Sequence, residues 1–235
     1  MATALITGAS RGIGKAAAEA FAAAGWDLLL VARSKEHLQS LSESLSASGP
    51  KVFFECIDLS DPNQISEGIN KLLGNGLQPS VLINNAGVAW TGELASMPLE
   101  KWNWLMQMNL TSIFQICSLM VPLMRKNKGL IINVSSHAAR NSFPQWGAYC
   151  VSKAALESFT KCLAEEERQL GVRTCTLTLG AVNSDLWESE YVSSDFDRKA
   201  MLSVHEVALE LLHLAMQPDS QIISDTTLMP SSGVL

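Results

Sequence analysis

The stretch "TALITGASRGIGKAAAEAFAAAG" at residues 3–25 joins a short apolar run, a glycine-rich turn and an alanine-rich segment. The run at 3–7 is nearly continuous in its hydrophobicity, as in a strand that is buried on both faces. The segment at 12–24 is expected to be helical. The stretch therefore predicts a strand, a tight turn and a helix, which together make the first half of a β-α-β unit.

The same alternation continues along the rest of the chain. Further apolar runs lie at 27–32, 51–57, 80–85, 129–136 and 172–179, with a less distinct one at 221–228. Segments that we expect to be helical lie between or after them, at 35–47, 61–74, 98–126, 147–170 and 204–216. Such alternation implies right-handed crossovers. The predicted fold is therefore α/β, a doubly wound Rossmann-like parallel sheet of about seven strands with helices on both faces.

The composition favours one folded domain over residues 1–235. Of the 235 residues, 47% are apolar and 17% are charged, so a large core can form and disorder is disfavoured. The length also permits two small domains. No Pro/Gly/Ser-rich linker or run of charge interrupts the pattern, and we therefore expect a single dinucleotide-binding and catalytic domain.

Charge and hydropathy indicate a small-molecule protein of the cytoplasm. The formal net charge is -6 and the basic residues are scattered, which argues against binding of nucleic acid or an anionic membrane. No run of about 18 apolar residues is present, and the start "MATALIT" lacks the basic head of a signal peptide. The five cysteines show no C-x-x-C spacing and the four histidines no ligand spacing, so we expect reduced thiols and no metal.

The glycine-rich turn indicates a phosphate-binding loop. Gly8, Gly12 and Gly14 stand in a G-x-x-x-G-x-G spacing after the first predicted strand. Glycines let the backbone approach a pyrophosphate, which amide groups at a helix N-terminus bind. The spacing differs from the usual G-x-G-x-x-G fingerprint, and a plain structural turn is the alternative.

The end of the second predicted strand indicates which dinucleotide is bound. An acid at this position suits the free 2′-hydroxyl of NAD, whereas an arginine suits the 2′-phosphate of NADP. Arg33 stands there, and Arg11 in the glycine loop offers a second guanidinium. We therefore predict NADP(H). Two ordinary surface arginines are the alternative, and Asp27 lies at the wrong end of the strand to meet the ribose.

Five motifs resemble those of the short-chain dehydrogenase/reductase family, in the family's order and over nearly the whole chain. They are "TGASRGIG" at 7–14, "NNAG" at 84–87, "NVSS" at 133–136, "YCVSK" at 149–153 and "LGAVNS" at 179–184. A lone Y-x-x-x-K is common, but five motifs in register are specific. The resemblance implies an NADP(H)-dependent oxidoreductase that transfers a hydride between nicotinamide and a carbonyl or alcohol substrate.

The resemblance also implies the site residues. The catalytic group would be Asn109, Ser136, Tyr149 and Lys153, with Ser136 preferred to Ser135 because it stands 13 positions before Tyr149. The residues implied for the cofactor are Gly8, Ser10, Arg11, Gly12, Ile13, Gly14, Arg33, Asp58, Leu59, Asn84, Ala86, Gly87, Tyr149, Lys153, Gly180, Val182 and Ser184.

The spacing of Tyr149 and Lys153 fits acid/base chemistry. Residues four apart on a helix share a face, so we expect the ammonium of Lys153 to lower the pKa of the phenol, ordinarily about 10, and to bond the nicotinamide ribose. Ser136 is expected to polarise the substrate carbonyl. Asn109 is expected to position a water that relays protons to Lys153.

The chain departs from the family pattern around the expected substrate site. Leu179-Gly180 replaces the frequent Pro-Gly, the substrate-binding loop region at 183–203 is short, and the C-terminus lacks the frequent Asp-Gly-Gly ending. An open pocket is expected. Trp90, Trp146 and Trp187 fall in loops that should flank it, which favours an apolar or aromatic ketone, although simple packing is the alternative. Acyl carriers, sugars, steroids and small ketones all fit the chemistry.

Two other functions are weighed against this one. A hydrolase would pair Ser136 with His137, but adjacent residues at a strand end point apart and no G-x-S-x-G elbow is present. A non-catalytic NADP(H) sensor would not need the Asn-Ser-Tyr-Lys set. Apolar residues on more than one face of 98–126 and 147–170 indicate subunit contacts, and the resemblance implies a homodimer or homotetramer through these helices. They are Trp102, Leu105, Phe114, Leu156, Phe159 and Leu163.

Overall fold

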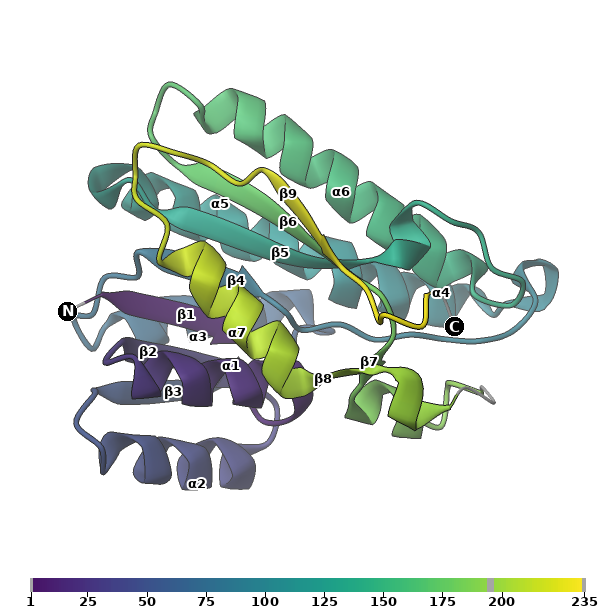
Figure 1. The fold of residues 1–235 in the computed structure, drawn as a ribbon, viewed down its shortest axis with the longest axis horizontal. Coiled ribbons are helices and arrows are strands. Elements are labelled where there is room, and N and C mark those ends of the chain that lie inside the picture. Colours follow the sequence, from purple (N-terminus) through teal and green to yellow (C-terminus); the bar gives the residue numbers. More distant parts are fainter. Residues whose placement is uncertain (1, 194–196, 234–235) are drawn as a thin grey trace.

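A parallel sheet of seven strands forms the centre of the computed structural model, which describes residues 2–193 and 197–233 (Figure 1). Its strand order is β3-β2-β1-β4-β5-β6-β9. The strands are β1 (Thr3–Thr7), β2 (Asp27–Ala32), β3 (Val52–Cys56), β4 (Val81–Asn84), β5 (Leu130–Ser136), β6 (Arg173–Leu179) and β9 (Asp225–Leu228). The predicted doubly wound, single-domain parallel sheet is confirmed. Only β9 is much shorter than its predicted run at 221–228.

Alternate residues of the central strands point to opposite faces and build two cores. Ala4 and Ile6 face one core, whereas Leu5 between them faces the other. The first core packs against α1 (Gly12–Ala23), α2 (Lys35–Ser46) and α7 (Val204–Ala215), and the second against α3 (Pro62–Leu73), α5 (Ser112–Met124) and α6 (Gly147–Glu167) (Figure 1). Burial on both faces explains why the runs were continuously apolar.

The helix predicted over 98–126 is interrupted. It consists of α4 (Leu99–Met106), a π-helical turn at Gln107–Thr111 and α5, followed by a 3-10 turn at Arg125–Asn127. By length and composition the stretch Leu99–Asn127 could cross a membrane, but half of its apolar window is buried inside the protein. Its buried side chains join the second core, as expected of a core helix. π-turns of this kind often mark functional sites.

The region at 183–203, predicted to bind substrate, contains a small second sheet that was not predicted. β7 (Val182–Asn183) pairs in parallel with β8 (Leu202–Ser203). Between them lie 3-10 turns at Asp185–Glu188 and Arg198–Ala200. Residues 194–196 of this region lie outside the described part of the chain. The pair fixes both ends of the loop beside α7.

The strand order reverses between β1 and β4. β1 pairs with β2 on one side and with β4 on the other, so the crossovers from these strands run to opposite faces of the sheet. The loops that leave the carboxyl ends of the two strands consequently diverge. In open α/β sheets this is where ligands bind.

Candidate active site

A cavity of about 920 Å³ opens at the carboxyl ends of the strands. The loops after β1, β2, β4, β5 and β6 all contribute to its wall. This volume lies within the range of small-molecule and cofactor sites. The cavity is therefore the candidate active site.

The glycine loop after β1 lies directly against the loop after β4. Gly8 has φ +68°, and a Cβ at this position would lie only 2.9 Å from Asn85 Nδ2 and 3.0 Å from Ala86 Cα. The Thr7 hydroxyl accepts hydrogen bonds of 3.0 Å from the amides of Asn85 and Ala86. Glycine at position 8 is thus required by conformation and by space, and the Thr7 hydroxyl ties the start of the glycine loop to the loop after β4.

The N-terminus of α1 is prepared for an anion. Arg11 occupies the cap position without a side-chain hydrogen bond to the first turn, whereas Ser34 caps α2 and Asp61 caps α3. Gly12 and Ile13, in the first turn of α1, line the cavity. Uncapped first-turn amides carry partial positive charge and bind phosphate groups well.

Positive charge borders the same part of the cavity. Arg33, exposed after β2, lines the wall together with Arg11. Ser34 and His37 lie beside it. Among the lining residues in the described chain, Asp185 carries the only carboxylate, and it lies 3.8 Å from the Arg11 guanidinium. Beside Arg33, the described lining residues therefore include no acid that would repel a phosphate.

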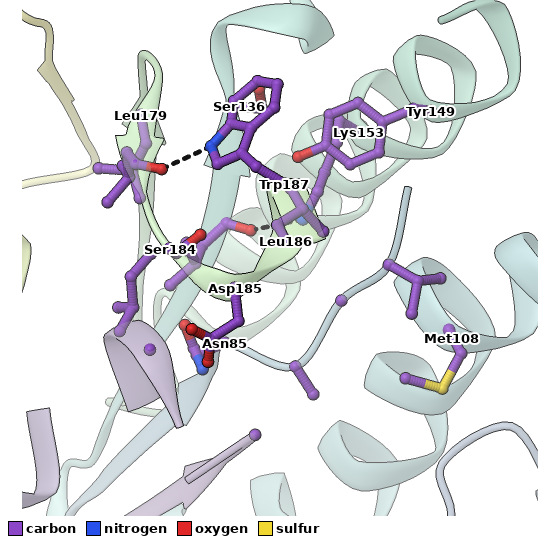
Figure 2. A pocket seen from close by; sticks show the side chains of 18 of the residues that line it. Asn85, Met108, Ser136, Tyr149, Lys153, Leu179, Ser184, Asp185, Leu186 and Trp187 are labelled. Atoms are coloured by element: carbon purple, nitrogen blue, oxygen red, sulfur yellow. Dashed lines mark hydrogen bonds between the residues drawn. The ribbon is translucent and has the colours of Figure 1, made fainter. Parts of the chain in front are cut away.

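Three of the predicted catalytic residues converge on the opposite part of the cavity (Figure 2). Tyr149 lies in the first turn of α6, Lys153 follows one turn later, and Ser136 ends β5. The Tyr149 and Ser136 side chains both line the cavity, and interaction with Ser136 lowers the pKa of the phenol. Lys153 Nζ donates to the Val134 carbonyl oxygen at 2.9 Å and lies 5.8 Å from the centre of the Tyr149 ring.

Burial controls the ionisation of this group. Desolvation raises the pKa of Tyr149 to about 12, and the interaction with Ser136 opposes that rise only in part. Desolvation also lowers the pKa of Lys153 to about 8. The net lowering of the Tyr149 pKa that was expected from Lys153 is not found, because desolvation by burial is the largest cause and raises that pKa. Tyr149 therefore keeps its proton at neutral pH.

Asn109 is placed differently from its predicted role. Its side chain is fully buried within the π-turn and does not reach the described wall of the cavity. Its Nδ2 donates to the Val88 carbonyl at 2.8 Å and to Ser152 Oγ at 3.0 Å, while Oδ1 accepts from the Val88 amide at 2.9 Å. These bonds use both Nδ2 hydrogens and one lone pair of Oδ1, so the side chain anchors the loop after β4.

Three residues predicted to touch the cofactor are not among the described lining residues. Asn84 is buried, and its Nδ2 bonds Asn133 Oδ1 at 2.8 Å. Asn85, the next residue, lines the cavity in its place. Gly14 packs against the backbone of the glycine loop, and Asp58 accepts hydrogen bonds from the amide and hydroxyl of Ser60. The other predicted cofactor residues line the wall. They are Gly8, Ser10, Arg11, Gly12, Ile13, Arg33, Leu59, Ala86, Gly87, Tyr149, Lys153, Gly180, Val182 and Ser184.

Several lining residues were not predicted. Trp146 and Trp187 line the cavity as expected, but Trp90 is not among the described lining residues and packs over Gly92 instead. Residues that sequence reasoning missed include Ser34, His37, Asn85, Val88, Met108, His137, Phe143, Pro144, Leu186 and Met229. Most of them flank a quoted motif, and this proximity is the signal that could have found them. Within the described residues, no group of three His, Cys, Asp or Glu is placed to hold a metal ion.

Comparison with known proteins gives consistent matches over nearly the whole chain. A family model described as short chain dehydrogenase matches residues 2–193. The 3-oxoacyl-[acyl-carrier-protein] reductase FabG of Escherichia coli (strain K12) is 30% identical over 233 residues, covering 95% of this chain and 93% of its own. The protein of the same name from Vibrio cholerae is 31% identical, with 98% and 96% covered.

Solved structures agree in fold. An alcohol dehydrogenase from the archaeon Thermococcus sibiricus, complexed with 5-hydroxy-NADP, matches with a TM-score of 0.90 at 27% identity, covering 98% of this chain and 97% of its own. A metagenomic short-chain oxidoreductase in complex with NADP matches with a TM-score of 0.85 at 31% identity and the same coverage. L-Sorbose reductase from Gluconobacter frateurii, complexed with NADPH and L-sorbose, matches with a TM-score of 0.86 at 25% identity, with 97% and 95% covered.

Proposed function

Because the chain belongs to the short-chain dehydrogenase family, we propose that it is an NADP(H)-dependent reductase of carbonyl compounds, with Tyr149 as the proton donor. The observation that carries this proposal is the convergence of Tyr149 and Ser136, with Lys153 one helical turn away, on the wall of the cavity. A phenol with a pKa of about 12 holds its proton at neutral pH and can therefore act as the proton donor when a carbonyl is reduced.

The described residues fit NADP(H) along the cavity. The glycine loop and the uncapped amides of α1 would hold the pyrophosphate, since Gly8 lets the backbone pass close to the ligand. Arg11 and Arg33 would bind the 2′-phosphate by charge-assisted hydrogen bonds. Three structural relatives were solved with NADP, NADPH or 5-hydroxy-NADP. Bound NADPH would supply the hydride.

Ser136 is set to donate to the substrate oxygen. Its Oγ accepts a hydrogen bond of 3.2 Å from the amide of Ala138, which orients the hydroxyl and leaves its O–H for another partner. Pointed at a carbonyl oxygen, this O–H stabilises the negative charge that develops there. Ser136 thus polarises the carbonyl and positions it against the phenol of Tyr149.

Tyr149 donates the proton, and Lys153 provides a positive charge beside it. A developing alkoxide is a stronger base than a phenolate, so the proton moves from Tyr149 to the substrate oxygen. The ammonium of Lys153 lies close enough to stabilise the phenolate that remains. With a pKa of about 8, Lys153 is mostly charged at pH 7. Asn109 enters the proposal as a positioning residue, because it fixes Val88 and Ser152 beside this group.

The test is NADPH oxidation by the purified protein with a broad panel of ketones, aldehydes and oxoacyl thioesters, with NADH run in parallel. We expect turnover of at least one class with NADPH and a preference for NADPH over NADH. Tight NADPH binding without oxidation by any carbonyl would contradict the proposal and would support a non-catalytic sensor.

The proposal extends to a homodimer or homotetramer in the cytoplasm. Phe114 on α5 is 55% exposed and makes an edge contact with Phe159 on α6, with ring centres 6.4 Å apart. Val151 on α6 is also exposed. A second copy would cover this apolar surface. Light scattering should give a mass of two or four chains, and a monomeric mass would contradict the assembly.

A further inference from the structure

An aromatic wall stands beside the Tyr149 hydroxyl. The ring of Trp146, the cap residue of α6, meets the Tyr149 ring edge-on at 5.7 Å between centroids. Trp187, in the 3-10 turn after β7, meets Trp146 in the same manner at 5.7 Å. All three rings line the cavity, and in Figure 2 Trp187 lies beside the phenol of Tyr149.

This wall is held in place by the protein. Trp187 Nε1 donates a hydrogen bond of 2.7 Å to the Val182 carbonyl (Figure 2), so its N–H is used internally and its ring offers carbon to the cavity. The loop that carries Trp187 is tied down further along, where Thr91 N donates to the Tyr191 carbonyl at 2.8 Å. The Tyr191 ring packs on Trp104 at 5.3 Å.

Apolar side chains extend the aromatic wall. Phe143, Pro144, Leu186 and Met229 are apolar. The polar lining residues near them are Ser136, His137, Tyr149, Lys153, Ser184 and Asp185. Ser136 and Tyr149 are assigned to the carbonyl oxygen. Hydroxyl groups of a sugar that lay against the rings of Trp146 and Trp187 would face ring carbon and would stay unpaired, which is costly.

We propose that this half of the cavity selects a neutral aryl carbonyl compound, an aryl ketone or aromatic aldehyde, whose ring packs against Trp146 and Trp187 while its oxygen meets Tyr149 and Ser136. The inference rests on the proposed carbonyl reductase function and narrows its substrate class. Flat rings gain offset or edge-on contacts with tryptophan that a saturated ring of the same size does not gain. The substrates in the names of two relatives, L-sorbose and 3-oxoacyl-[acyl-carrier-protein], carry no aryl ketone or aromatic aldehyde.

The decisive measurement compares acetophenone with cyclohexyl methyl ketone, which has the same carbon skeleton without the aromatic ring. We expect kcat/KM for NADPH oxidation to be about ten-fold higher with acetophenone. Trp146→Leu and Trp187→Leu should each bring this ratio towards one. Trp102→Leu is the matched control, because Trp102 on α4 is not among the described lining residues, and its ratio should stay as in the parent protein.

L-Sorbose and acetoacetyl-CoA complete the substrate panel. They distinguish a failure of the aromatic preference from a failure of the reductase function. Faster turnover of either, or of the saturated ketone, would overturn the aromatic preference while leaving the reductase function in place. No oxidation with any carbonyl, despite NADPH binding followed by fluorescence, would overturn both. The ratio of kcat/KM for acetophenone to that for cyclohexyl methyl ketone in the parent protein tests the aromatic preference even if a tryptophan variant fails to fold.

Discussion

Lys153 donates a hydrogen bond of 2.9 Å to the main-chain carbonyl of Val134, and only 5% of the lysine is exposed to solvent. One neutral acceptor does not replace the water that a buried ammonium loses, and the pKa falls to about 8. A lysine at this place therefore destabilises the folded protein at neutral pH. This cost in stability is consistent with a role for the Lys153 charge in the chemistry at Tyr149.

We predict that Lys153→Met stabilises the protein at pH 7 while abolishing turnover. The folded pKa of about 8 lies below the ordinary value of 10.5, so the unfolded chain binds more protons between these pH values. The loss of folding free energy caused by the buried Lys153 ammonium is fully present below pH 8, where it amounts to at most about 3 kcal/mol. It decreases as the pH rises to 10.5. Urea unfolding at pH 7 should show a gain of about 1–3 kcal/mol, reduced by the lost hydrogen bond.

Lys161→Met supplies the control for this stability measurement. Lys161 lies on the same helix but is exposed, so its replacement should change the free energy of unfolding by less than about 0.5 kcal/mol. A Lys153→Met protein that is less stable than the parent at pH 7 would show that the buried ammonium is better compensated than its single bond indicates.

The decrease of kcat/KM at alkaline pH should follow the loss of the proton from Lys153. Tyr149, with a pKa of about 12, stays protonated throughout an assay between pH 6 and 10, whereas Lys153 loses its charge around pH 8. We expect kcat/KM for carbonyl reduction to fall as the pH rises through about 8, because the phenolate left after proton transfer loses its neighbouring cation. Initial rates at constant ionic strength measure this. A flat profile up to pH 9.5 would contradict the role given to Lys153.

Removing the Tyr149 hydroxyl should separate chemistry from binding. Tyr149→Phe keeps the ring that packs against Trp146 but removes the proton donor, so kcat should fall by a factor of about 10² to 10⁴ while the Kd for NADPH stays within a few-fold. Tyr191→Phe is the matched control, since Tyr191 is the other tyrosine of the sequence and its ring packs on Trp104. Near-parental turnover of Tyr149→Phe would refute the assignment.

The strands and helices were predictable because they are built from local patterns. β1, β2 and β4 are buried along their whole length and read as continuous apolar runs. The π-turn at Gln107–Thr111 was not predicted, since it accompanies bonds from Asn109 to Val88, which is 21 positions away in the sequence. The β7–β8 pair was also missed, because each strand has two residues and too little pattern to detect.

The kind of site and the segments that form it could be predicted from the sequence. The direction in which each side chain points could not. The motif at 84–87 indicated a cofactor loop, yet it did not distinguish Asn84, whose side chain turns into the core to bond Asn133, from Asn85, which lines the cavity. The direction of the Tyr149 pKa was likewise out of reach. It depends on how deeply the fold buries the phenol, and spacing along a helix carries no information about burial.

Arg33 should set the preference for NADPH. We expect Arg33→Ser to raise the Kd for NADPH about 10- to 100-fold, because a charge-assisted hydrogen bond to the 2′-phosphate is lost, and to change the Kd for NADH little. Lys35→Ser is the control, as Lys35 is exposed nearby but is not among the described lining residues. Titration of intrinsic tryptophan fluorescence gives both constants. Equal weakening of NADPH and NADH binding would argue against phosphate recognition by Arg33.

The buried carboxylate of Glu157 makes Arg140 important for stability. Glu157 accepts hydrogen bonds from Ser135 Oγ at 3.3 Å, Thr178 Oγ1 at 3.2 Å and Arg140 Nε at 3.2 Å, and Arg140 also pairs with Asp225 on the edge strand β9. Arg140→Met would leave this carboxylate buried without its cation and would release the tie to β9. Because the arginine itself is partly exposed, we expect a loss of about 2 kcal/mol in the free energy of unfolding.

Arg168→Met tests whether this loss comes from burial. Arg168 pairs with Glu165 on the surface of α6, where both side chains are exposed, so its removal should cost no more than about 0.5 kcal/mol. Chemical denaturation of the two variants under the same conditions compares a buried carboxylate with an exposed one at a constant chemical change. Equal losses would mean that Glu157 is solvated well enough without Arg140, and that β9 is held by its ladder to β6 alone.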